Sequence, residues 1–211
     1  MDAAGGRNVF RYGDPNRADV RIPAPDPRST MLTDFVRDQA FTIAWFGVMA
    51  FAWFGWAQED PEPSWRWKLG VGSAVGMLLA VPFVWAVIQG WQQPTALEGR
   101  YPWFGVLVAV EVVLAGAGAL VLWRRGQARW VAWWIAVVVA AHFLPMVWLL
   151  NDVSLALLAV LQLAGLVALV PLLRRSTRTT SRVACPLMGA SLLLFALASA
   201  VVFVLRHGSP F

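Results

Sequence analysis

Glu111 and His142 are the two residues in this sequence whose types and positions could do chemistry, because each lies in the middle of a long apolar segment. A carboxyl group and an imidazole can exchange a proton, or can hold a polar ligand between them. An ionisable side chain at the middle of a bilayer costs about 2.5–3.5 kcal/mol on insertion scales, so it usually faces protein or a cavity and has a partner. We therefore take this pair as the first candidate for a functional site.

The spacing of the two residues predicts that they meet. Residues 102–123 and 130–150 are apolar, and each segment has about the 20 residues that a helix needs to cross a bilayer. The short basic turn 124–129 makes the two predicted helices antiparallel neighbours. Glu111 and His142 lie equally far from the middle of this turn, so we expect them at the same depth in the membrane.

A third polar residue, Gln162, is predicted at that depth in the following helix. A carboxyl, an imidazole and an amide at one level could form a proton-active or ligand-binding site. They could instead form a hydrogen-bond cluster that only stabilises the bundle, but such bonds average about 0.6 kcal/mol, less than the insertion cost of a carboxyl. Glu111 also shares a helix face with Ala115 and Gly118, which predicts that its carboxyl is buried in the bundle.

Tryptophan is the most unusual feature of the composition, with 13 residues in a chain of 211. About half of them fall at the ends of apolar segments, where an interfacial aromatic belt explains them. Most of those further inside are expected to pack or to face lipid. A few could line a cavity that holds an apolar or cationic ligand through cation–π attraction. The candidates for such a lining are Trp45, Trp53, Trp85, Trp134 and Trp148.

The composition places the chain among membrane proteins. Hydrophobic residues make up 59% of it and charged residues 14%, against about 45–50% and 25% in soluble domains. We predict an all-α polytopic protein, with a polar, disordered tail at residues 1–37 and six transmembrane helices in one bundle at residues 38–207. The predicted helices are residues 38–57, 69–90, 102–123, 130–150, 153–173 and 183–205.

The basic residues predict the orientation and the surroundings of the protein. Nine of them lie in the loops after the first, third and fifth helices: Arg66, Lys68, Arg124, Arg125, Arg129, Arg174, Arg175, Arg178 and Arg182. By the positive-inside rule these loops are cytoplasmic and both termini are outside, although the arginines of the tail oppose its translocation. We expect a multi-pass protein of a bacterial inner membrane. The net charge of +5 then indicates contact with membrane lipid and not with nucleic acid.

Small residues recur every fourth position in the second helix, at Gly72, Gly76 and Ala80. Such a stripe lets two helices approach closely. It predicts packing within the bundle or, alternatively, a homodimer through this face.

Motifs for known cofactors and catalytic sites are missing from the sequence. Cys185 is the only cysteine and there are two histidines, which gives no zinc pattern, and the only lysine, Lys68, lies at an interface. We therefore predict no metal and no cofactor, and leave open whether the protein is an enzyme. The stretch from His142 to Pro145 (His-Phe-Leu-Pro) resembles a His-Phe-x-Pro signature of small bacterial membrane proteins of unassigned function. This resemblance implies a six-helix bundle and no particular activity.

Three functions are compatible with these residues. The first is a membrane protein that binds or translocates a small molecule or a proton at the Glu111–His142 site. The second is a membrane-embedded enzyme that uses Glu111 as a general acid on a lipid-like, isoprenoid substrate. The third is an accessory or structural protein without chemistry.

Overall fold

The computed structural model describes residues 34–210, and these contain six long α-helices and no strand. All six helices are long and apolar enough to cross a membrane, which confirms the predicted all-α, six-helix fold of a multi-pass membrane protein. Most of the predicted tail lies outside the described residues, and its last two residues already belong to the first helix. The helices are α1 (Val36–Trp56), α2 (Arg66–Gln89), α3 (Tyr101–Arg124), α4 (Val131–Leu150), α5 (Ser154–Arg175) and α6 (Ser181–His207).

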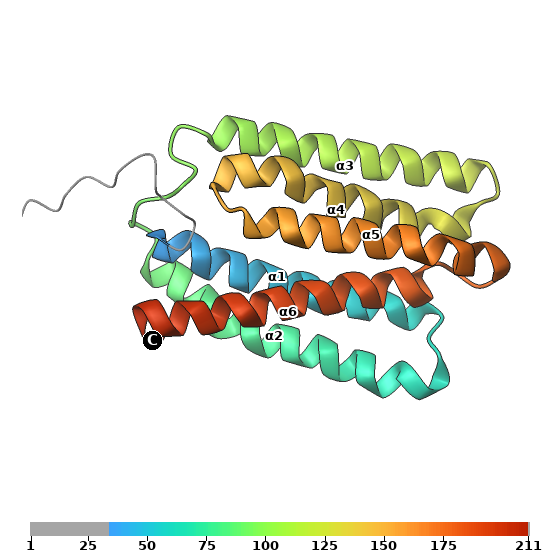
Figure 1. Ribbon diagram of the computed structural model, residues 1–211, viewed down its shortest axis with the longest axis horizontal. Helices are drawn as coiled ribbons and strands as arrows, with labels where there is room; N and C mark the ends of the chain where they lie inside the picture. Colours follow the sequence, from blue (N-terminus) through green and yellow to red (C-terminus); the bar gives the residue numbers. More distant parts are fainter. Residues whose placement is uncertain (1–33, 211) are drawn as a thin grey trace, which may run out of the picture.

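The helices form one bundle of two groups (Figure 1). Helices α1, α2 and α6 pack together in one group, and α4 packs against both α3 and α5 in the other. Helix α6 also contacts α4 and α5, and so joins the groups. Helices α1 and α4 face each other across bulky aromatic side chains, such as the edge-to-face pair Phe46 and Phe143 with ring centroids 5.5 Å apart. The space between the groups is therefore the place for a cavity.

The small-residue stripe of α2 explains why α1 and α2 lie so close. A Cβ atom built on Gly76 would lie 2.6 Å from the carbonyl oxygen of Gly47, and one on Gly47 would lie 2.6 Å from the carbonyl oxygen of Gly76. A Cβ on Gly72 would meet the ring of Phe54 at 2.8 Å, and Ala80 is buried. This face of α2 is covered by α1, so the stripe serves packing within the bundle. A homodimer stays a prediction.

Helix α3 lies at the edge of the bundle, and none of its residues is buried. It is held mainly through α4, where Gly118 makes room for the indole of Trp134 and the Trp134 N–H donates to the carbonyl of Leu114 at 3.0 Å. The expectation that the Glu111 carboxyl is buried in the bundle holds only in part, since 21% of this side chain is exposed. The sequence could not show this, because α3 is apolar on every side and its small-residue face does not identify its neighbours.

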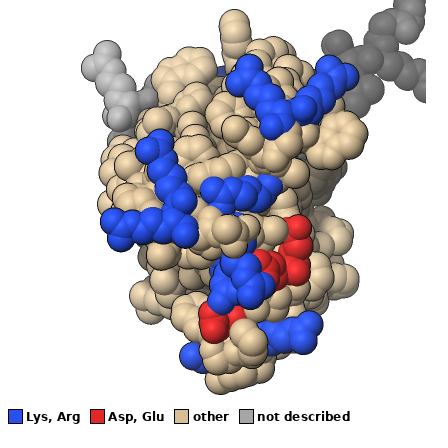
Figure 2. All heavy atoms as spheres, turned by 90° about the vertical axis from the view of Figure 1, so that its right-hand side faces the viewer, with Lys and Arg blue, Asp and Glu red and all other residues tan. Residues whose placement is uncertain are grey.

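The two ends of the bundle differ in charge. The nine basic residues of the predicted cytoplasmic loops all lie at the end where α1 joins α2, α3 joins α4 and α5 joins α6. Figure 2 shows this end, with Lys and Arg side chains spread over most of the face and the acidic side chains gathered in one part of it. We call it the basic end, and we call the other one, where α1 and α3 begin, the opposite end.

Candidate functional site

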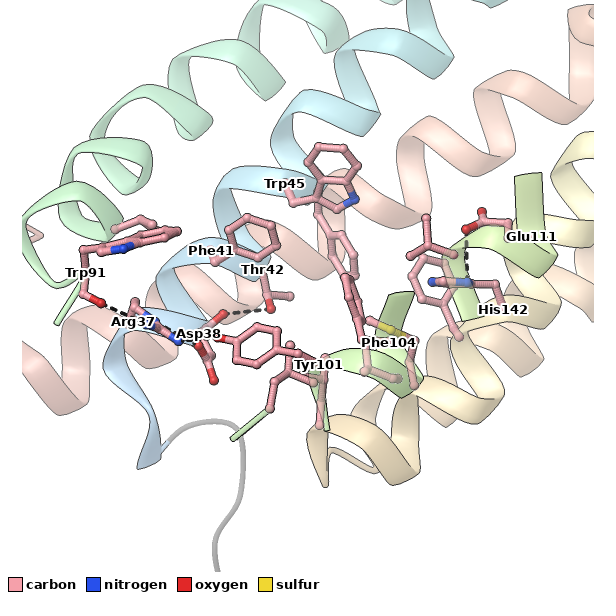
Figure 3. Close-up of a pocket in the computed structure, with 18 residues that line it drawn as sticks. Arg37, Asp38, Phe41, Thr42, Trp45, Trp91, Tyr101, Phe104, Glu111 and His142 are labelled. Atoms are coloured by element: carbon pink, nitrogen blue, oxygen red, sulfur yellow. Dashed lines mark hydrogen bonds and ion pairs between the residues drawn. The ribbon is translucent and has the colours of Figure 1, made fainter. Parts of the chain in front are cut away.

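Glu111 and His142 meet, as their spacing predicts. The Nδ1 atom of His142 lies 3.0 Å from Oε2 of Glu111, with 10% of the histidine side chain and 21% of the glutamate side chain exposed (Figure 3). Nδ1 is itself shielded, and the contact has the distance of an ion pair without the alignment of a hydrogen bond. The two groups can therefore exchange a proton after a small rotation of either side chain.

A cavity of about 470 Å³ lies between α1, α3 and α4, and Glu111 and His142 form its inner end. In Figure 3 the imidazole extends from α4 toward the space in which the aromatic side chains gather. The lining is mainly aromatic, and it contains Phe41, Trp45, Phe46, Trp91, Tyr101, Phe104 and Phe143. A volume of this size accommodates a small organic molecule, and apolar walls with a few polar groups are typical of a ligand site.

A second cavity, of about 320 Å³, begins on the other side of the pair. It also contacts Glu111 and His142, but continues along α1 past Trp53 and Trp56 toward the basic end. The first cavity uses the beginning of α1 and the end of α4, whereas the second uses the end of α1 and the middle of α4. Trp45 borders both cavities. The Glu111–His142 pair thus stands between two cavities that follow each other along the bundle.

A polar cluster around Arg37 and Asp38 closes the first cavity at the opposite end (Figure 3). Arg37 donates to the carbonyl of Trp91 at 2.9 Å and to the hydroxyl of Tyr101 at 3.1 Å, while Asp38 accepts from the backbone N–H of Ala96 at 2.6 Å. These bonds fasten the loop between α2 and α3 to the start of α1. Sequence reasoning missed this cluster, because its partners are 54 to 64 positions away along the chain. A possible signal was the adjacent Arg and Asp at the start of a spanning helix.

Gln162 does not join the pair. Its side chain is fully buried, and its amide donates to the hydroxyl of Ser191 on α6 at 2.8 Å. It lines neither of the two cavities that border Glu111 and His142. Its depth follows from counting along the helix, but its direction around the helix axis does not, and in the structure it points to α6.

The five candidate tryptophans separate into lining and non-lining residues. Trp45 lines both cavities, Trp53 lines the second, and Trp134 lines a third, smaller one at the basic end. Trp85 and Trp148 are 51% and 62% exposed and line none of these three cavities. The guanidinium of Arg100 lies 5.2 Å from the centre of the Trp148 ring, which fits an interfacial anchor.

No family model matches the chain, and no curated protein or solved structure is significantly similar to it. Among residues 34–210, no group of three His, Cys, Asp or Glu side chains is placed to hold a metal ion. The functional argument therefore depends on the two cavities and on the pair between them.

Proposed function

We propose that the protein binds a small, apolar cation between α1, α3 and α4 and translocates it in exchange for a proton held by Glu111 and His142. The observation that supports this most is the position of the pair between two cavities. A group that is reached from two successive cavities can take up a proton or ligand from one and release it to the other. An intramembrane ionisable residue in a cavity is also the usual mark of such a pathway.

The ligand class follows from the charges and rings that face the first cavity. Asp38 is paired with Arg37 and accepts a backbone hydrogen bond, so its charge is already compensated. Glu111 is the acidic group at the inner end of the cavity, with the neutral or protonated His142 beside it. A cation with an apolar body would gain attraction to the Glu111 carboxylate and cation–π contact with rings such as Trp45.

The exchange keeps the charge of the site constant. When Glu111 is ionised, the carboxylate attracts the cation; when the pair takes up a proton, that attraction is lost and His142 in its charged form repels the ligand. Since either protonation opposes the cation, we expect binding to weaken as the pH falls. A site that is always either protonated or occupied never exposes an uncompensated charge to the low dielectric of the membrane.

The test uses the purified full chain in lipid nanodiscs and tetraphenylphosphonium as the probe. Binding to the wild type should weaken by about tenfold for each pH unit in the range where the pair takes up one proton, measured between pH 5 and 8. Glu111→Gln keeps the shape of the side chain but removes its charge, so binding should be weak and independent of pH. His142→Gln should shift the pH profile. Glu98→Gln, an exposed acid in the α2–α3 loop that lines neither cavity, is the matched control and should behave as the wild type.

Proteoliposomes then test translocation. A tetraphenylphosphonium gradient should drive proton movement in the opposite direction in the wild type and in Glu98→Gln, and not in Glu111→Gln. Identical pH profiles for the wild type and Glu111→Gln would show that the pair is only structural, and the proposal would be abandoned.

The exposure of the cavity lining favours a second candidate, general acid catalysis on a lipid-like isoprenoid. Phe41 and Trp45 on α1 and Tyr101 on α3 are each about half exposed, so an apolar substrate could enter from the bilayer between the two helices. Protonated Glu111 would then transfer its proton to a double bond, and the resulting carbocation would lose a proton to the Glu111 carboxylate as a new double bond forms, which restores the acid. Incubating proteoliposomes with squalene and analysing the recovered lipid by mass spectrometry tests this candidate. Unchanged squalene would exclude that substrate, and a product formed equally by Glu111→Gln would exclude the role of Glu111.

A further inference from the structure

The basic end has more positive charge than the acidic groups near it can compensate. Asp60 forms an ion pair with Arg178, with 3.0 Å between Oδ1 and Nη1, and Glu62 forms one with Arg182. Arg129 is used differently, since it donates to the carbonyls at the end of α5. The side chains of five arginines of this face make no hydrogen bond or ion pair with any described residue: Arg66, Arg124, Arg125, Arg174 and Arg175.

One of these arginines borders a cavity of about 260 Å³, which we call the basic notch. The notch is formed where α3 ends, α4 begins and α5 ends. Its polar groups are Arg174, at the end of α5, and Gln127, in the turn between α3 and α4, whereas Trp134 and Val170 lie about a turn further toward the middle of the bundle. The notch is thus polar at the membrane surface and apolar below it.

Two of the three tryptophans that line the notch, Trp133 and Trp134, offer their rings and not their N–H groups. The indole of Trp134 already donates to the carbonyl of Leu114 at 3.0 Å, and that of Trp133 donates to the carbonyl of Leu166 at 3.0 Å. Their hydrogen-bonding capacity is therefore used within the bundle. What they present to an occupant is apolar surface, and Arg174 presents an uncompensated guanidinium fork.

We infer that the basic notch binds an anionic phospholipid, with its phosphate on Arg174 and the beginning of an acyl chain against Trp134 and Val170. A guanidinium matches a phosphate through two parallel hydrogen bonds, and basic pockets between transmembrane helices are suited to anionic head groups. Arg175, which follows Arg174, and the pair Arg124 and Arg125 at the end of α3 add to the attraction without filling the notch. A soluble anion would use the charge but would leave the apolar floor unoccupied. This inference is independent of the function proposed for Glu111 and His142.

The experiment measures lipid binding to the purified full chain in detergent by native mass spectrometry. Phosphatidylglycerol and phosphatidylcholine with the same acyl chains are titrated separately. We expect the wild type to bind the anionic lipid more tightly, and Arg174→Gln to weaken that binding by about fivefold, the factor for one arginine near a charged membrane surface. Arg174→Lys should retain part of the binding, since it keeps the charge but loses the planar fork.

Arg66→Gln is the matched control, because Arg66 also lacks a partner at the basic end but belongs to α2 and does not line the notch. It should leave the anionic preference unchanged. Equal losses in Arg66→Gln and Arg174→Gln would mean a diffuse attraction to the whole face and would overturn the site. Equal binding of both lipids, or displacement of the lipid by soluble glycerol phosphate at the same concentration, would also overturn it.

Discussion

Helices α2 and α3 are both attached to the bundle through a glycine, but in different ways. Gly76 of α2 meets the backbone of α1, with its hypothetical Cβ 2.6 Å from the carbonyl oxygen of Gly47. Gly118 of α3 meets only a side chain, the indole of Trp134. Backbone contact fixes two helices relative to each other, whereas a side chain can turn aside. We therefore take the α1–α2 pair as the rigid frame of the protein, and expect α3 to be the wall of the cavity that moves at the lowest cost.

The largest effect is expected from Gly76→Ala. The added methyl group would overlap the backbone of α1, so the two helices must separate, and overpacking of this kind costs about 1–3 kcal/mol or more. We expect a clear loss of thermal stability of the purified protein, measured by a thermal unfolding scan.

Gly116→Ala is the control for this change, because nothing lies within 4 Å of its hypothetical Cβ on α3. Alanine favours a helix over glycine, so this variant should be neutral or more stable by about 0.4–1 kcal/mol. If Gly76→Ala were as stable as Gly116→Ala, α1 and α2 would not be in backbone contact. The α1–α2 pair would then be held no more rigidly than α3.

Gly118→Ala should have an intermediate effect. Its methyl group would displace the indole of Trp134 and break the bond from Trp134 to the carbonyl of Leu114, but the side chain can adopt another rotamer. Gly118 lies seven positions after Glu111, which places them on the same face of α3. A shift of α3 would therefore also move Glu111 away from His142. We expect a smaller loss of stability than for Gly76→Ala, together with a weaker pH dependence of tetraphenylphosphonium binding. A wild-type pH profile would show that α3 does not transmit this change.

Much of this architecture follows from the sequence, because segment length and apolar content alone determine which helices can span a membrane. Because Glu111 and His142 lie equally far from a short turn, the sequence also predicted that they lie at one depth. Depth can be predicted in this way because it follows from counting residues along a helix from its turn. The direction of a side chain around its helix depends on which neighbours the helix has, and these are chosen by packing across the whole chain.

Three residues show where this limit applies. Glu111 was expected to be buried in the bundle, and it is only partly buried because α3 lies at the edge. Gln162 was predicted at the depth of His142, with its direction left open, and in the structure it faces α6. Arg37 fastens a loop that follows it by more than 50 positions, and no local pattern predicts that contact. A uniformly apolar helix has no amphipathic pattern that would identify its inner face, so in each case the partner had to be seen in the structure.

The smallest effect is expected from Gln162→Leu. This variant tests whether Gln162 only stabilises the bundle or belongs to the Glu111–His142 site. The change removes a hydrogen bond to Ser191, and in membrane helices such bonds average about 0.6 kcal/mol. It also removes Oε1 of Gln162, a buried oxygen without a hydrogen-bond partner in the described part of the chain, which offsets part of that loss. Ser191 still donates to the carbonyl of Met188 at 3.0 Å and is not left unsatisfied.

Because Gln162 borders neither cavity of the pair, Gln162→Leu should also leave the pH dependence of tetraphenylphosphonium binding as in the wild type. Thermal unfolding and the binding assay between pH 5 and 8, with Glu111→Gln measured in parallel, check both expectations. A flattened pH profile in Gln162→Leu would mean that the amide, the imidazole and the carboxyl act as one network across α3, α4 and α5. The site would then include Gln162 in the interior of the bundle, and it would no longer be confined to the residues that line the two cavities.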